Sequence, residues 1–182
     1  MTKNSDRAAF RKLQEYQRRS ETFKPGTGAS GGHSQEWSGV TFRLGEQRLA
    51  CNIDKVQEIL PLPVATPVPG AKPWILGLAN VRGTLMTIVD LAWFLKGERT
   101  AQSARSRLLA TGPVKAPVGL LIDEVFGQRH FLDSDATDAN LPDDSPLRGL
   151  VQREHLQGNE TWQELELDQL FKSTEFLNGA AT

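Results

Sequence analysis

The amino-acid sequence predicts an all-β fold made of two small barrels. From Trp37 onward the chain consists of short apolar segments, each ended by Gly, Pro, Asn or Asp, which is typical of strands joined by tight turns. No long stretch with a helical period interrupts them. A faint internal repeat divides this part of the chain in two. About ten strands are too many for one small barrel, so the sequence favours two related barrels packed side by side.

The strands are predicted from β-branched and aromatic residues that alternate with polar ones. Single Gly, Pro or Asp residues separate most of these segments, as turns require. In chain order the predicted strands cover residues 39–45, 47–53, 56–62, 74–81, 84–91, 106–112, 118–127, 129–132, 149–156 and 161–167.

The internal repeat relates residues 77–95 to residues 149–171. Each segment begins with Gly-Leu, continues as a hairpin and a strand, and then reaches an Asp followed by an amphipathic turn. Two segments of one chain that show the same features in the same order are the signature of a duplicated unit. The repeat therefore predicts two barrels with the same plan.

The N-terminal part differs in composition from the rest. Residues 6–22 carry Phe10, Leu13 and Tyr16 at helical spacing among basic residues, which predicts a helix with a narrow apolar stripe. This helix could pack loosely on the domain, dock a partner or touch a membrane surface. Residues 24–36 are rich in Gly and Ser and predict a flexible tether. We therefore expect a helix and tether over 1–36 and a domain over 37–178.

Charge and composition limit the possible functions of the 182-residue chain. The net charge is −1, but residues 1–24 are basic and the remainder is acidic, so the body lacks the basic face that nucleic-acid binding needs. No apolar run is long enough to span a membrane, and the charged N-terminus has no secretory signal. The single cysteine, Cys51, has no intrachain partner. A cytoplasmic protein without direct membrane insertion is expected.

Candidate catalytic and metal-binding residues are few. Asp90, Asp123 and Asp168 close apolar strands, where a carboxylate most often caps the following turn. The acidic stretch 133–144 resembles a calcium loop in part, but Asp138 stands where the loop needs Gly. The G-x-G-x-x-G pattern at 26–31 lacks the preceding strand of a dinucleotide site. No catalytic residue, metal site or cofactor is predicted.

The hairpin at residues 74–91 contains the most unusual polar residues. Asn80 and Arg82 share one face of the first strand, and Gly83 can supply the positive φ of a tight turn. Arg82 at this tip could keep the tip soluble, pair with Glu58 or Asp90, or contact a partner protein with its planar donor group. The preceding prolines, between residues 61 and 73, are expected to stiffen an edge strand and its connection.

Several motifs resemble the CheW family of chemotaxis coupling proteins. They are KVQEIL at 55–60, TPVPGAKPWILGLANVRG at 66–83, TIVDL at 87–91, GLLIDEV at 119–125 and the closing LELDQLF at 165–171. The resemblance covers residues 37–176, and the N-terminal extension is similar to the pilus-motility, PilI-like branch. The polar segment 155–165 departs from the family pattern.

The resemblance implies two five-stranded SH3-like barrels around a shared core and a non-enzymatic adaptor. Such adaptors couple the cytoplasmic tip of a methyl-accepting chemoreceptor to the CheW-like regulatory domain of a CheA-like histidine autokinase, in arrays at the membrane. The implied output is type IV pilus (twitching) motility, with flagellar chemotaxis as an alternative and a nucleic-acid-binding barrel as a remoter one. By motif, the implied partner-binding residues are Val56, Glu58, Ile59, Asn80, Arg82 and Gly83.

Overall fold

The structure is a computed structural model that describes residues 35–113 and 116–180. The predicted N-terminal helix at 6–22 lies outside the described residues. The first described strand, β1, begins at Glu36, which the sequence had placed at the end of the tether. No helix in the described ranges combines the length and apolar character needed to cross a membrane.

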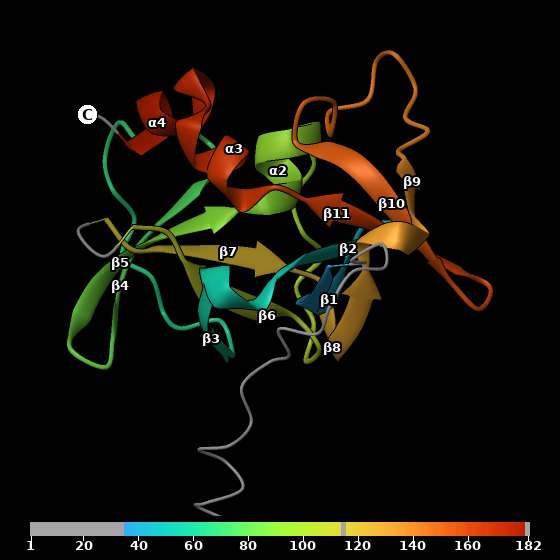
Figure 1. The fold of residues 1–182 in the computed structure, drawn as a ribbon. Coiled ribbons are helices and arrows are strands. Elements are labelled where there is room, and N and C mark those ends of the chain that lie inside the picture. Colours follow the sequence, from blue (N-terminus) through green and yellow to red (C-terminus); the bar gives the residue numbers. More distant parts are fainter. Residues whose placement is uncertain (1–34, 114–115, 181–182) are drawn as a thin grey trace, which may run out of the picture. The chain divides into compact units, whose positions relative to one another are not determined.

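The described chain is mostly β, with short helices after two of the hairpins (Figure 1). Two single 3-10 turns, Ile53–Lys55 and Asp133–Asp135, follow strands. The helices are α2 (Leu91–Lys96), α3 (Leu167–Lys172) and α4 (Thr174–Ala180). The strands are β1 (Glu36–Leu44), β2 (Gln47–Asn52), β3 (Val56–Leu60), β4 (Ile75–Val81), β5 (Thr84–Asp90), β6 (Arg107–Thr111), β7 (Val118–Ile122), β8 (Glu124–Leu132), β9 (Ala136–Asp138), β10 (Val151–Gln157) and β11 (Glu160–Leu165).

The strands form two mixed sheets with the same plan. Lobe A is the sheet β8-β1-β2-β11-β10-β9, and lobe B is the sheet β3-β6-β7-β5-β4. In lobe A the strand β8 pairs with the antiparallel hairpin β1–β2, and β2 runs parallel to β11 of a second hairpin. In lobe B the strand β3 pairs with the antiparallel hairpin β6–β7, and β7 runs parallel to β5 of a second hairpin. The second hairpins, β4–β5 and β10–β11, are the two copies of the sequence repeat, and each leads into a helix. The predicted division into two related β units is confirmed.

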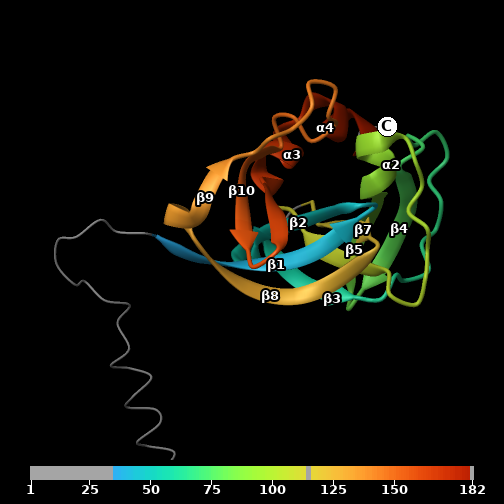
Figure 2. The same ribbon diagram turned by 90° about the vertical axis from the view of Figure 1, so that its right-hand side faces the viewer.

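The two halves of the chain exchange strands between the lobes. The chain forms the β1–β2 hairpin of lobe A and then crosses into lobe B for β3, β4 and β5. It continues in lobe B with the β6–β7 hairpin and returns to lobe A for β8 to β11. The lobes meet where β1 of lobe A contacts β7 of lobe B (Figure 2). Each lobe is therefore built from both halves of the sequence.

The exchanged hairpins are buried on both faces because they lie between two cores. Along β6 and β7 alternate side chains point in opposite directions: Leu109 and Leu120 join the core shared by the lobes, whereas Leu108 and Leu121 fill the interior of lobe B. In lobe A, Leu49 faces the shared core, and the next residue, Ala50, faces a smaller interior cluster. This alternation on a doubly buried strand explains the continuous apolar segments of the sequence.

Three details of the strand prediction are wrong. The predicted strand 118–127 is two strands, because Asp123 ends β7 and the chain there passes between the lobes. The segment 129–132 is part of β8 rather than a separate strand. The acidic stretch contains the short strand β9, which was not predicted and which gives lobe A six strands instead of five.

The proline-rich connection between β3 and β4 runs along the edge of lobe B. Thr66 exchanges two backbone hydrogen bonds with Leu78 of the edge strand β4, of 2.7 and 2.8 Å. Gly77 makes this approach possible: its φ is 141°, and a Cβ there would lie 2.2 Å from the carbonyl oxygen of Thr66. Any side chain at position 77 would therefore collide with the backbone of Thr66.

We expect Leu120→Ala to destabilise both lobes together. Leu120 lies in lobe B but is fully buried in the shared core, so its truncation should lower the free energy of unfolding by about 2–5 kcal/mol. Urea unfolding followed by circular dichroism and by tryptophan fluorescence, which includes Trp162 of lobe A, should give one coincident transition. Two separated transitions would show that the lobes unfold independently.

Gly77→Ala should destabilise the protein more than a matched glycine substitution. Gly127 also has a positive φ, 130°, but no atom lies within 4 Å of the position of its Cβ. Both changes carry backbone strain of about 1–3 kcal/mol. Only Gly77→Ala adds a steric clash with Thr66, which should cost about 1 kcal/mol or more beyond the control in urea titrations. Equal costs would show that the connection moves aside freely.

Candidate functional site

The tip of the β4–β5 hairpin is a tight turn centred on Arg82 and Gly83. Val81 pairs with Thr84, which leaves Arg82 and Gly83 as a two-residue loop. Their φ values are 50° and 87°, and positive φ at both central positions is the mark of a type I′ turn. Such turns favour Asn-Gly, because most other side chains are strained there. Arg82 is the only residue other than glycine with a positive φ in the described part of the chain.

Asn80 stabilises this turn from the strand before it. Its Oδ1 accepts a hydrogen bond of 2.8 Å from the backbone N–H of Gly83. The motif N-x-R-G therefore has a local structural cause: Asn80 holds the turn, and Gly83 adopts its conformation without strain. These two residues fix the direction in which Arg82 leaves the turn.

Arg82 reaches across the seam of lobe B, the gap between its two edge strands β3 and β4. Its Nη2 lies 2.6 Å from Oε1 of Glu58 on β3, although β3 and β4 are at opposite ends of the sheet order. The ion pair shows that the sheet curls until its two edges meet. The Arg82 side chain is still 80% exposed, whereas that of Glu58 is 29% exposed. Of the two carboxylates predicted as possible partners, Glu58 is the one that Arg82 contacts.

The other predicted site residues divide between the surface and the interior. Ile59 follows Glu58 on β3 and is 40% exposed, which is high for an isoleucine. Val56 is only partly buried and packs against the shared core, so it supports β3 instead of forming the exposed surface. Glu58, Asn80, Arg82 and Gly83 lie together through the contacts described above.

Leu85 is a surface residue that the sequence analysis missed. It pairs with Asn80 across the hairpin, and 62% of its surface is exposed. Its position could have been predicted from the strand pairing. In a hairpin with a two-residue loop, the residue two positions after Gly83 lies opposite Asn80 and faces the same side. We define the hairpin surface as Glu58, Ile59, Asn80, Arg82, Gly83 and Leu85.

Lobe A has an equivalent seam with the charges reversed. Arg129 of β8 contacts Glu160, at the start of β11, with its Nη2 2.8 Å from Oε2. Gln157 at the end of β10 donates a 2.7 Å hydrogen bond to the carbonyl of His130 on β8. Arg48 also pairs with Glu160 and stacks over Trp162. Each lobe is therefore closed by polar contacts between its outer strand and its second hairpin.

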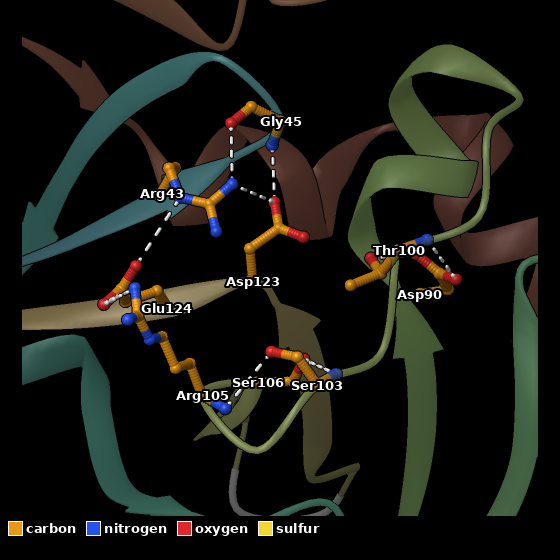
Figure 3. Close-up of polar contacts among 9 residues, drawn as sticks. All are labelled: Arg43, Gly45, Asp90, Thr100, Ser103, Arg105, Ser106, Asp123 and Glu124. Atoms are coloured by element: carbon orange, nitrogen blue, oxygen red, sulfur yellow. Dashed lines mark hydrogen bonds and ion pairs between the residues drawn. The ribbon is translucent and has the colours of Figure 1, made fainter.

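Two of the aspartates that might suggest catalysis hold turns instead (Figure 3). Asp90 caps α2 by accepting a bond from the N–H of Trp93, and it accepts further bonds from the backbone and hydroxyl of Thr100. Asp123 accepts a 2.5 Å bond from the N–H of Gly45, in the β1–β2 turn. The capping or turn role predicted for these two residues is confirmed.

The same prediction is wrong for Asp168. The N-cap position of α3 is Glu166, and Asp168 lies within the first turn of the helix. Its Oδ2 accepts a 2.7 Å hydrogen bond from Nζ of Lys55, which raises the pKa of that lysine. Lys55 follows β2, where the chain leaves lobe A. This exposed ion pair joins the crossover to α3.

The remaining candidate groups have structural surroundings. Burial raises the pKa of the Cys51 thiol to about 12, so it is protonated at neutral pH and a poor nucleophile. Asp133 of the acidic stretch pairs with Arg153 at 3.0 Å. Within residues 35–113 and 116–180, no three His, Cys, Asp or Glu side chains lie together as metal ligands would.

The comparison with protein families identifies the fold of residues 38–175. They match the model of the CheW-like domain. The chain belongs to the CheW-like domain family. The match includes every residue of the hairpin surface and all strands of both lobes except the first two residues of β1.

Named relatives come from several bacteria. Protein PilI of Pseudomonas aeruginosa is 39% identical over 65% of this chain, and this alignment spans only 64% of that protein's length. Protein FrzA of Myxococcus xanthus is 32% identical over 64% of the chain and 69% of its own length. Chemotaxis protein CheW of Thermotoga maritima is 29% identical over 60% of the chain and 72% of its own length.

A solved structure has the same fold at lower identity. The crystal structure of the scaffolding protein TtCheW from Thermoanaerobacter tengcongensis superposes with a TM-score of 0.67 and 19% identity. The superposition covers 78% of this chain and 96% of that protein. The predicted fold class is therefore confirmed.

Arg82→Asn should leave the fold as stable as the original or make it more stable. The replacement removes left-handed strain of about 1–2 kcal/mol. It loses one largely exposed ion pair, which is worth about 0.2–1 kcal/mol. Arg82→Ala is the matched control, because it loses the same ion pair and keeps the strain. Thermal unfolding should rank Asn above Ala, and the opposite order would contradict the strain at Arg82.

Proposed function

We propose that this chain is a non-enzymatic adaptor that couples a methyl-accepting chemoreceptor to a CheA-like histidine autokinase. The proposal is supported by family membership and by relatives named as chemotaxis and scaffolding proteins.

We propose that the output is type IV pilus motility. The support is the similarity to protein PilI, which is 39% identical over 65% of the chain, whereas a relative named chemotaxis protein CheW is 38% identical over only 47% of it. Flagellar chemotaxis is the alternative output. Deletion of the gene should reduce twitching zones on agar while swimming is retained, and the reverse result would assign the protein to a flagellar pathway.

The observation that carries the binding proposal is the strained arginine at the hairpin tip. Arg82 adopts the left-handed conformation in which a type I′ turn favours Asn or Gly, so this position carries backbone strain. Strained residues of this kind concentrate at functional sites. Arg82 also exposes most of its side chain, and two further residues of the hairpin surface, Ile59 and Leu85, are exposed and apolar. Arginine and apolar side chains are both typical of protein interfaces.

The proposed mechanism is differential binding. An adaptor can shift a kinase between two states only if its affinity for the two states differs. The Glu58–Arg82 ion pair joins the two edge strands of lobe B, so the strands that carry the hairpin surface are held together. When a receptor or kinase changes its conformation, it would gain or lose contacts with this surface, and its affinity for the adaptor would change.

Charge-exchange variants test whether Arg82 binds a partner or only closes the seam. Arg82→Glu should weaken binding to receptor-tip or kinase-regulatory-domain fragments by about thirtyfold or more, since an interface arginine is worth about 2 kcal/mol. The double variant Glu58→Arg, Arg82→Glu restores the internal ion pair. We expect the double variant to regain stability but not binding, as measured by calorimetry.

Arg105→Glu is the matched control. Arg105 is 75% exposed and has a longer ion pair, 3.6 Å, with Glu124 outside the hairpin surface. Its substitution should leave both affinities within about twofold. If the double variant recovers full binding, Arg82 acts only inside the fold, and the proposed contact is wrong.

A further inference from the structure

The described part of the chain ends in the short helix α4, which covers part of the shared core (Figure 1). Phe176 of α4 is 5% exposed and belongs to that core. One turn later, Gly179 is buried against Trp74, and a Cβ at this glycine would lie 2.6 Å from Nε1 of the indole. Trp74 in turn packs edge-on against Phe94, with the ring centroids 5.4 Å apart. The backbone at Gly179 is therefore part of the packing.

The residue before this glycine is an exposed asparagine. Asn178 is followed by Gly179, and no other asparagine of the sequence precedes a glycine. In an Asn-Gly pair the asparagine side chain reacts most readily with the backbone that follows it. Glycine has no side chain to hinder the approach, and it reaches conformations that other residues do not. This reaction is one reason why asparagine is a thermolabile residue.

The end of α4 leaves the backbone of Asn178 free to take part in this reaction. Ring closure requires rotation about ψ of Asn178, which the hydrogen bonds of a helix interior oppose. The last four carbonyl groups of a helix have no partner within it, and in α4, which ends at Ala180, they include the carbonyl of Asn178. Helix ends also open at little cost in free energy. The last turn of α4 can therefore open while Phe176 stays in the core.

We propose that Asn178 is a site of spontaneous deamidation and that the product alters the packing of α4 on Trp74. The backbone nitrogen of Gly179 attacks Cγ of Asn178, and the new N–Cγ bond closes a succinimide ring. The bond between Cγ and Nδ2 breaks, and Nδ2 leaves as ammonia with the proton of the Gly179 amide. Water then opens the ring. Attack of water at Cγ gives aspartate, and attack at the α-carbonyl carbon gives isoaspartate.

The isoaspartate product does not fit the packing at Gly179. Its main chain runs through Cβ and Cγ of residue 178, so it is longer by a methylene group and carries a free carboxylate. Gly179 has no space in which to move toward Trp74. The longer chain must therefore move the end of α4 away from the indole. The added negative charge also lies at a helix C-terminus, where it is unfavourable. This inference does not depend on the proposed receptor or kinase partners.

Peptide mapping of the full chain tests the reaction. The purified protein is kept for days in mildly alkaline buffer below its unfolding temperature, and its proteolytic peptides are then analysed by mass spectrometry. We expect Asn178 to lose its amide and, in water enriched in heavy oxygen, to take up solvent oxygen, as ring hydrolysis requires. Asn140 and Asn159 are the controls and should keep their amides, because they are also exposed but are followed by Leu141 and Glu160.

Two variants separate the reaction from its consequence. Asn178→Gln carries the same amide but would have to close a larger ring, so its amide should persist. Asn178→Asp carries the charge of the product without the added methylene group. We expect the thermal midpoint of the aged chain to lie about 2–4 °C below that of Asn178→Asp, the shift of a modest loss of packing in a chain of this size. The amides of α4 should also exchange hydrogen faster in the aged chain.

Three results would overturn the proposal. If Asn178 keeps its amide in the folded chain while a free peptide of residues 173–182 converts completely, the fold protects the site. If Asn140 or Asn159 converts first, the Asn-Gly pair does not determine the reaction. If the aged chain and Asn178→Asp have the same thermal midpoint and the same exchange rates, the added methylene group does not disturb the packing of α4.

Discussion

The exchange of hairpins between the two lobes is the constraint on which the rest of the structure depends. The β1–β2 hairpin completes the sheet of the second half of the chain, and the β6–β7 hairpin completes that of the first. These four strands are covered on both faces, by a lobe interior on one and by the shared core on the other. Neither half can bury its apolar residues alone, so the lobes form one rigid unit on which surface features keep fixed positions.

That rigidity explains how a strained turn is tolerated at the tip of lobe B. The β3 strand reaches lobe B only because the chain crosses from β2, and the curl of the sheet then brings Glu58 next to the β4–β5 hairpin. The contact with Glu58 and the bond from Gly83 to Asn80 hold Arg82 in a conformation it would not adopt in a free peptide. The backbone strain at Arg82 lowers the stability of the turn, and the same conformation holds its guanidinium group in a largely exposed position. In lobe A the outer strand and the second hairpin are joined by the Arg129–Glu160 ion pair, and neither residue has a positive φ.

Much of this could be predicted from the sequence because local patterns carry it. Alternating apolar residues located most strands, and the repeat identified the two hairpins that lead into α2 and α3. The break at Asp123 was missed because a doubly buried strand shows no alternation that could mark where one sheet ends and the next begins. The Arg82–Glu58 contact was one of several possible pairings, and only the curl of lobe B selects it. The role of Asp168 could not be read at all, since Lys55 is far from it in the chain.

If partners bind the hairpin surface of lobe B, as we propose, their binding should change the NMR signals of that surface. Backbone amide signals of the isotope-labelled protein can be followed by NMR during titration with a kinase-regulatory-domain fragment and, separately, with a receptor-tip fragment. For at least one of them, we expect the largest shifts and losses of intensity at residues 58–59 and 80–85, with smaller changes at the β10–β11 tip of lobe A. Saturable binding of both fragments that leaves the signals of residues 58–59 and 80–85 unchanged would show that partners bind elsewhere.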